Sequence, residues 1–202
     1  DQYDISRPTV RQAINELTAA GQLYKLKGKG TFVAAQKNNV NIKDYTGFTD
    51  SILDSKDPSE KNIVSIDIVA GQDHPKVLEA FGMKKEGTNE FAAITYTNSM
   101  RNEVVSLSVS YIPLALFPEI VEDIKSNKDV LRGKYPLIPN SSKSTLDVVN
   151  TDQKDAVYLQ LQPGQPLIRI HNILYSKSGQ PVEYIITKYR ADKTRLQFEN
   201  RK

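Results

Sequence analysis

Apolar residues near the start of the chain recur at helical spacing. The repeating positions are Val10, Ala13, Ile14 and Leu17. Intervals of three and four residues are typical of a helix with one apolar face. Ser6 is a good N-cap, Pro8 is tolerated in a first turn, and Gly21 suits a C-cap. The pattern predicts a short helix whose polar N-terminal end carries Arg7 and Arg11.

A basic hairpin is predicted directly after this helix, over residues 25–33. Gly28 and Gly30 allow a tight turn, and the lysines around them can neutralise phosphates. A nucleotide-binding P-loop is excluded because it needs a glycine five residues before its Gly-Lys pair, where this chain has Leu23. A helix with a cationic leading edge, followed by a basic hairpin, favours DNA binding.

The rest of the chain alternates short helices with longer strands. Polar residues over 36–45 predict a linker between residues 1–35 and a larger unit at 46–200. The apolar pattern then predicts helices at 75–81, at 118–125 and from Thr151 onward, and strands at 91–96, 104–111, 167–175 and 182–189. Polar residues 98–102 are expected to form the turn of the first strand pair.

An internal repeat is visible in this second unit. A helix, a glycine, a strand, a polar turn and a strand ending in Tyr111 are followed by the same series ending in Tyr189. Two helix-plus-hairpin units predict a duplicated α+β domain built on an antiparallel sheet, with flanking helices.

Composition narrows the function classes. The chain has 202 residues, a net charge of +3, 39% hydrophobic residues and no cysteine. The lack of cysteine excludes disulfides, cysteine-ligated zinc and thiol catalysis. No apolar run approaches the roughly 20 residues that cross a bilayer, so no membrane association is expected and the cytoplasm is the predicted location.

Catalytic and metal sites are not expected. His74 and His171 are the only histidines, and neither has a second histidine or a carboxylate at helical metal-ligand spacing. The nucleophile elbow of hydrolases is missing, and the acidic residues at 119–123 suit the exterior of a helix. We therefore predict no catalytic residue, no metal ligand and no cofactor.

The motifs at the N-terminus resemble a known family. The Ser-Arg-Pro-Thr-Val-Arg-Gln-Ala run at 6–13, Leu23-Tyr24 and the Gly-Lys-Gly-Thr-Phe-Val run at 28–33 resemble the second half of a GntR-family winged helix-turn-helix. The remainder is similar to the UTRA effector-binding domain of the HutC-type subfamily, which shares the fold of chorismate lyase. The chain begins near the end of the family's positioning helix, so we expect a partial DNA-binding domain.

The resemblance implies contacts with operator DNA and with a second copy of the chain. Family members use residues matching Ser6, Arg7, Thr9 and Arg11 on the operator, while the wing tip matching Lys27 and Gly28 enters the minor groove. Palindromic half-sites require a two-fold protein, so a homodimer is expected.

The resemblance also implies an effector site. The family loop matching Phe48, Thr49 and Asp50 offers amides and a hydroxyl to an anion, and Glu183 and Tyr189 match its acidic residue and tyrosine on the last core strand. Tyr96 and Asn98 stand where an arginine pair often holds a phosphate, and Ser108 where a glutamate is frequent. Either the phosphate is held differently, with Lys143 and Ser144 as candidates, or the effector is not a sugar phosphate.

These observations favour a bacterial ligand-responsive transcription regulator, a repressor that binds operator DNA as a homodimer. A small metabolite such as a sugar or sugar phosphate would control it through the C-terminal domain. Two alternatives stay open. One is a sensing module that does not bind DNA, and the other is an enzyme similar to chorismate lyase.

Overall fold

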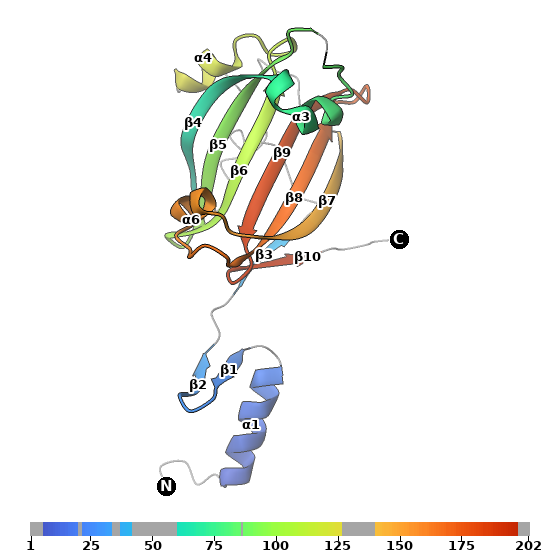
Figure 1. Cartoon of the computed structure of the whole chain (residues 1–202). Coiled ribbons are helices and arrows are strands. Elements are labelled where there is room, and N and C mark those ends of the chain that lie inside the picture. The colour runs from blue at the N-terminus through green and yellow to red at the C-terminus, as the bar shows by residue number, and fades with distance from the viewer. Residues whose placement is uncertain are drawn as a thin grey trace.

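A computed structural model describes residues 6–19, 22–33, 37–41, 60–85, 87–126 and 140–197. Its architecture is α+β, with a small helix-and-hairpin unit drawn below a larger sheet in Figure 1. The elements are α1 (Arg7–Ala19), β1 (Leu23–Leu26), β2 (Gly30–Val33), β3 (Asn38–Asn41), β4 (Glu60–Ala70), the 3-10 helix η2 (Gly71–Asp73), α3 (Pro75–Ala80), β5 (Glu90–Met100), β6 (Glu103–Pro113), α4 (Ile120–Lys125), β7 (Ser141–Asn150), α6 (Gln153–Leu159), β8 (Pro166–Tyr175), β9 (Pro181–Arg190) and β10 (Thr194–Gln197).

The N-terminal unit contains the predicted helix and hairpin. The Ser6 hydroxyl accepts a hydrogen bond from the Thr9 amide at 3.3 Å, as an N-cap does. The Lys25 ammonium donates to the Asn15 side chain at 2.6 Å, which ties the hairpin to the helix. The predicted apolar stripe is only partly covered, since Val10 is 45% exposed. The Gly21 cap lies outside the described residues.

The larger unit is an antiparallel sheet in the order β4-β5-β6-β9-β8-β7. Its two halves have the same plan, because a strand, a helix and a hairpin recur as β4-α3-β5-β6 and β7-α6-β8-β9. The halves meet where β6 pairs with β9, and Ser108 lies opposite Thr187 there. The structure confirms the predicted duplication and adds the opening strands β4 and β7, which the sequence pattern did not predict.

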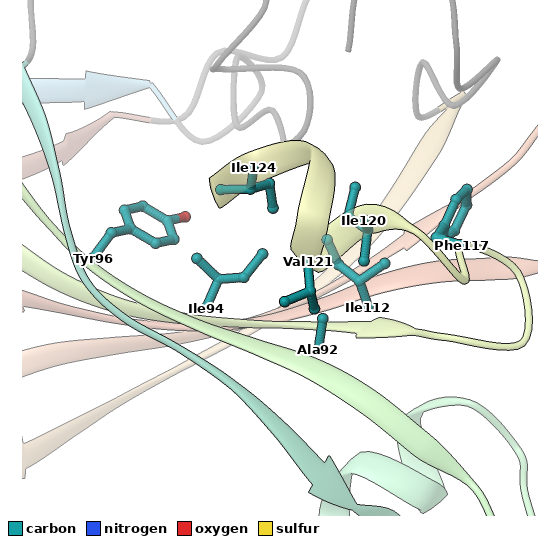
Figure 2. Close-up of a cluster of buried hydrophobic side chains, with 8 residues drawn as sticks. All are labelled: Ala92, Ile94, Tyr96, Ile112, Phe117, Ile120, Val121 and Ile124. Atoms are coloured by element: carbon teal, nitrogen blue, oxygen red, sulfur yellow. The ribbon is translucent and has the colours of Figure 1, made fainter. Parts of the chain in front are cut away.

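Helices cover different parts of the two faces of this sheet. On one face α3 packs on Phe91 and Tyr111, and α6 packs on Leu107 and Leu167. On the opposite face Ile120, Val121 and Ile124 of α4 lie against β5 and β6, as Figure 2 shows. We call these the α3/α6 face and the α4 face.

Two boundaries differ from the sequence prediction. The predicted linker contains β3, which pairs in parallel with β10 near the end of the chain. The predicted turn over 98–102 is shorter, because only Arg101 and Asn102 adopt positive φ angles, of 53° and 62°. Such a two-residue turn matches the twist of the flanking strands. Asn98 therefore belongs to β5.

Candidate ligand site on the sheet and DNA-binding surface

A group of polar side chains lies on the α4 face, along the four central strands and beside the apolar cluster under α4. We call it the polar strip. Its members are Tyr96 and Asn98 on β5, Ser106, Ser108 and Ser110 on β6, Glu183, Thr187 and Tyr189 on β9, and Asn172 on β8. All are buried except Asn98, which is half-buried. Ser144 lies at the outer edge of the strip, on β7.

The local sequence explains the strip. Alternate residues of a strand point to opposite faces, so the Ser-Leu-Ser-Val-Ser run of β6 places its hydroxyls on one face and its apolar side chains on the other. Leu107 and Val109 pack on the α3/α6 face. The centre of the α4 face thus carries small hydroxyl groups where a sheet core usually carries large apolar ones.

Hydrogen bonds join the strip across the strands. The Ser110 hydroxyl donates to a Glu183 carboxylate oxygen at 2.5 Å, and the Ser108 and Thr187 hydroxyls lie 3.0 Å apart. At the two flanks, the Asn98 amide nitrogen donates to Ser106 at 3.1 Å and Ser144 donates to Asn172 at 2.9 Å. These bonds fix the side chains in place on the sheet.

Two amide atoms of the strip remain without a hydrogen-bond partner among the residues that the structure describes. They are the side-chain oxygen of Asn98 and the side-chain nitrogen of Asn172, and both are buried. A buried polar atom without a partner costs free energy, so such atoms often mark the place of a water or a ligand. One can accept a hydrogen bond and the other can donate one.

Tyr96 is held in its neutral form by its surroundings. Burial raises the pKa of its phenol far above the ordinary value, and the nearby charge of Glu183 raises this pKa further, although a hydrogen bond with Ser108 opposes the shift. Figure 2 shows the ring at the border of the apolar cluster. The phenol therefore keeps its proton and can donate a hydrogen bond at neutral pH.

The N-terminal unit presents its polar side chains on the surface. Ser6, Arg7, Thr9 and Arg11 are all exposed at the N-terminal end of α1. Lys27 and Gly28 are exposed in the turn between β1 and β2, where Gly28 has a φ of 76° that favours glycine. The N-terminal end of α1 and the turn between β1 and β2 thus both carry groups that can contact phosphates and base edges.

Comparison with known families decides what these two units are. Residues 69–195 match the model of the UTRA domain, and residues 1–33 match that of the bacterial regulatory proteins of the gntR family. The chain belongs to the UTRA-domain family of GntR-type regulators. Its N-terminal unit lies within the GntR match, and the duplicated sheet from the end of β4 onward lies within the UTRA match.

Curated relatives of this UTRA protein include transcriptional repressors. A probable fructoselysine utilization operon transcriptional repressor from Escherichia coli K12 is 27% identical over 204 residues, which cover 100% of this chain and 82% of the relative. The HTH-type transcriptional repressor NagR of Bacillus subtilis is 27% identical over 195 residues, which cover 96% and 79%.

A solved structure has the same fold. The crystal structure of the possible transcriptional regulator YydK from Bacillus subtilis matches with a TM-score of 0.66 and 18% identity, covering 99% of this chain and 85% of that one. No described helix of the present UTRA protein is long and apolar enough to span a membrane.

The UTRA sheet brings together the described residues that the sequence predicted for the effector site. These are Tyr96, Asn98, Ser108, Ser144, Glu183 and Tyr189. Phe48, Thr49 and Asp50 lie outside the described residues. Lys143 is not part of the strip, because it pairs with Ile173, which packs on the α3/α6 face. The roles of these residues in ligand binding remain predictions.

Sequence reasoning missed other members of the strip. Ser106 and Ser110 could have been found, since serine at every second position of a predicted strand indicates one polar face. Thr187 could have been found in the same way, because it lies two residues before Tyr189 and four after Glu183 on one strand. Asn172 carries no such signal, because it becomes part of the strip only through the pairing of β8 and β9. A separate hollow of about 390 Å³ lies between Met83 and Pro118, and none of the predicted residues lines it.

Proposed function

We propose that this chain is a ligand-controlled transcription repressor that binds operator DNA as a homodimer. A small polyhydroxylated metabolite would bind on the polar strip and change the affinity of the protein for DNA. Residues 1–35 would serve as the DNA-binding part, residues 36–45 as the connection and residues 46–200 as the sensor.

The polar strip carries this proposal. A sheet core gains stability from apolar burial, so a row of buried hydroxyls, a carboxylate and two unsatisfied amide atoms needs another explanation. Carboxylate and amide oxygens accept hydrogen bonds from sugar hydroxyls, while Tyr96 and the Asn172 amide can donate to them. The name of the Escherichia coli relative, which refers to a sugar derivative, agrees with this ligand class.

The ligand part of the proposal is tested by thermal-shift screening. A compound that binds only the folded chain raises its melting temperature, by an amount that grows with ligand concentration. Free sugars, sugar phosphates and amino-acid derivatives form the panel. We expect stabilisation by members of the sugar classes, and a panel in which only amino-acid derivatives stabilise the chain would contradict the proposed ligand class.

The DNA part is tested by selecting duplexes from a random pool and then measuring their binding by gel shift. We expect enrichment of palindromic sequences, because a two-fold protein reads two half-sites. The ligand found in the thermal screen should then change the affinity for the enriched duplex. Recovery of no enriched sequence would favour the sensing module without DNA binding.

A further inference from the structure

Lys61 is the cation that lies beside the polar strip. It belongs to the edge strand β4 and pairs with Asn98, which places both side chains on the α4 face. Its ammonium lies 6.0 Å from the centre of the Tyr96 ring, a distance at which a cation is attracted to an aromatic face. Lys61 is half-buried, so its charge is less screened by solvent than that of an exposed lysine.

The other cations on the six strands of the sheet lie on the opposite face. Lys188 contacts Asp155 of α6, and Arg190 donates to the carbonyl of Leu159 in the same helix. Arg169 pairs with Asp147, and both lie on the α3/α6 face. Lys143 lies on the same face, opposite Ile173. Among the described strand residues, Lys61 is therefore the cation on the face that carries the strip.

Charge is distributed unevenly along the strip. Glu183 reaches Ser110, which lies opposite Ile94, whereas Lys61 lies opposite Asn98. Ile94 and Asn98 are four positions apart on β5, which corresponds to about 13 Å at the usual rise of roughly 3.3 Å per residue. The strip thus has an acidic end, which suits hydroxyl donors, and a cationic end, which suits an anion.

We propose that Lys61 forms an anion subsite, which binds a phosphate or carboxylate group of the effector while the hydroxylated part of that effector lies along the strip. This inference rests on the proposed ligand-binding function of the strip. The unsatisfied oxygen of Asn98 lies beside the subsite and would accept a hydrogen bond from a neighbouring hydroxyl of the same ligand. Lys61 then determines whether the site selects an anionic sugar over its neutral parent.

The test compares matched neutral and anionic ligands. The probes are N-acetylglucosamine and its 6-phosphate, fructose and its 6-phosphate, and glucose with glucuronate as the carboxylate arm, while inorganic phosphate reports on the anion alone. Binding to the full chain is measured by calorimetry for wild type, Lys61→Met and Lys61→Arg. Lys143→Met is the control, because it removes the same charge from the other edge strand and the other face.

We expect the wild type to bind the anionic member of at least one pair about tenfold more tightly or better. Lys61→Met should abolish this preference and leave the affinity for the neutral sugar within about twofold, while Lys61→Arg and Lys143→Met should keep the preference. A preference for the sugar phosphates alone would identify the bound anion as a phosphate, and a preference for glucuronate alone would identify it as a carboxylate.

Two results would overturn the inference and leave the proposed function standing. One is a wild type that binds a neutral sugar as well as its anionic partner. The other is a Lys61→Met variant that loses affinity for both members of a pair equally, as expected of a lysine that only supports the fold. If no probe binds the wild type, the proposed ligand class fails and the inference fails with it.

Discussion

Glu183 is the acidic member of the polar strip, and only 2% of its surface is exposed. Hydrogen bonds to a charged group are worth about 1.5–3 kcal/mol, against roughly 1 kcal/mol for neutral pairs. Glu183→Gln keeps an oxygen that can accept from Ser110 but removes the charge. We therefore expect sugar affinity to fall about tenfold in calorimetric titrations. Glu122→Gln, which changes an exposed carboxylate on α4, should bind as the wild type does. Equal affinities of the Glu183 variant and the wild type would remove Glu183 from the site.

Arg7 and Arg11 lie at the exposed N-terminal end of α1, where a recognition helix contacts DNA. We expect Arg7→Ala and Arg11→Ala each to weaken binding of a selected duplex by about 1–3 kcal/mol in gel-shift titrations. Arg195→Ala is the matched control, since it removes an exposed arginine from β10. Ligand-induced thermal stabilisation should be the same in all three variants. A loss of DNA affinity as large in the control would argue against a specific role for the helix.

At the scale of elements, the sequence predicts those strands in which apolar and polar residues alternate. The strands β5, β6, β8 and β9 alternate clearly and were predicted, whereas β7 is exposed along almost its whole length and has little apolar alternation to detect. In β4 a bulge between Ile63 and Ser65 breaks the alternation. Because β4 was missed, Lys61 was missed with it. The family resemblance predicted most residues of the polar strip. Asn172 could be assigned to it only from the pairing of β8 with β9 in the structure.

The short helix α6 is fixed to the sheet by an ion pair that can be tested. Lys188 on β9 contacts the buried carboxylate of Asp155 at 2.6 Å, while its own side chain is 24% exposed. Removing one partner of a buried pair leaves a charge in an apolar environment. We expect Lys188→Met to lower the free energy of unfolding by about 2 kcal/mol in urea titrations, below the roughly 3–5 kcal/mol of a fully buried pair because solvent reaches the lysine.

The double variant Lys188→Met with Asp155→Asn distinguishes two causes of lost stability. One is the buried Asp155 carboxylate left without its cation, and the other is the lost packing of the Lys188 side chain. It no longer leaves a bare carboxylate, so we expect it to recover about half of the lost stability. Lys143→Met again serves as the control and should unfold as the wild type does. A double variant less stable than Lys188→Met would show that the Asp155 carboxylate stabilises the fold through more than its pairing with Lys188, because the backbone amide of Asp155, which donates to Asp152 at 2.7 Å, is unchanged by the substitution.

For the whole molecule, the proposed function requires that binding of a ligand on the sheet alters the N-terminal unit. Strand β9 carries Glu183 and Tyr189 of the strip and leads through a short turn into β10, which pairs with β3. Strand β3 in turn follows the hairpin of the N-terminal unit along the chain (Figure 1). At this junction the Asn38 amide donates to the Lys193 carbonyl at 2.7 Å, and the Lys37 ammonium donates to the Ala191 carbonyl at 2.8 Å. The turn that follows β9 and the segment that leads from the N-terminal unit into β3 therefore contact each other directly.

Substitution at Asn38 tests this contact. Proline has no amide hydrogen, so Asn38→Pro removes the bond to Lys193, whereas Asn38→Ala keeps the backbone donor and changes only the side chain. Coupling between two sites is a free energy, measured as the ratio of operator affinities with and without ligand. We expect Asn38→Pro to bring that ratio toward one while ligand affinity stays within about twofold, because the strip itself is untouched. Asn38→Ala should keep the wild-type ratio. If Asn38→Pro also keeps it, the coupling between the two units does not depend on the hydrogen bond between Asn38 and Lys193.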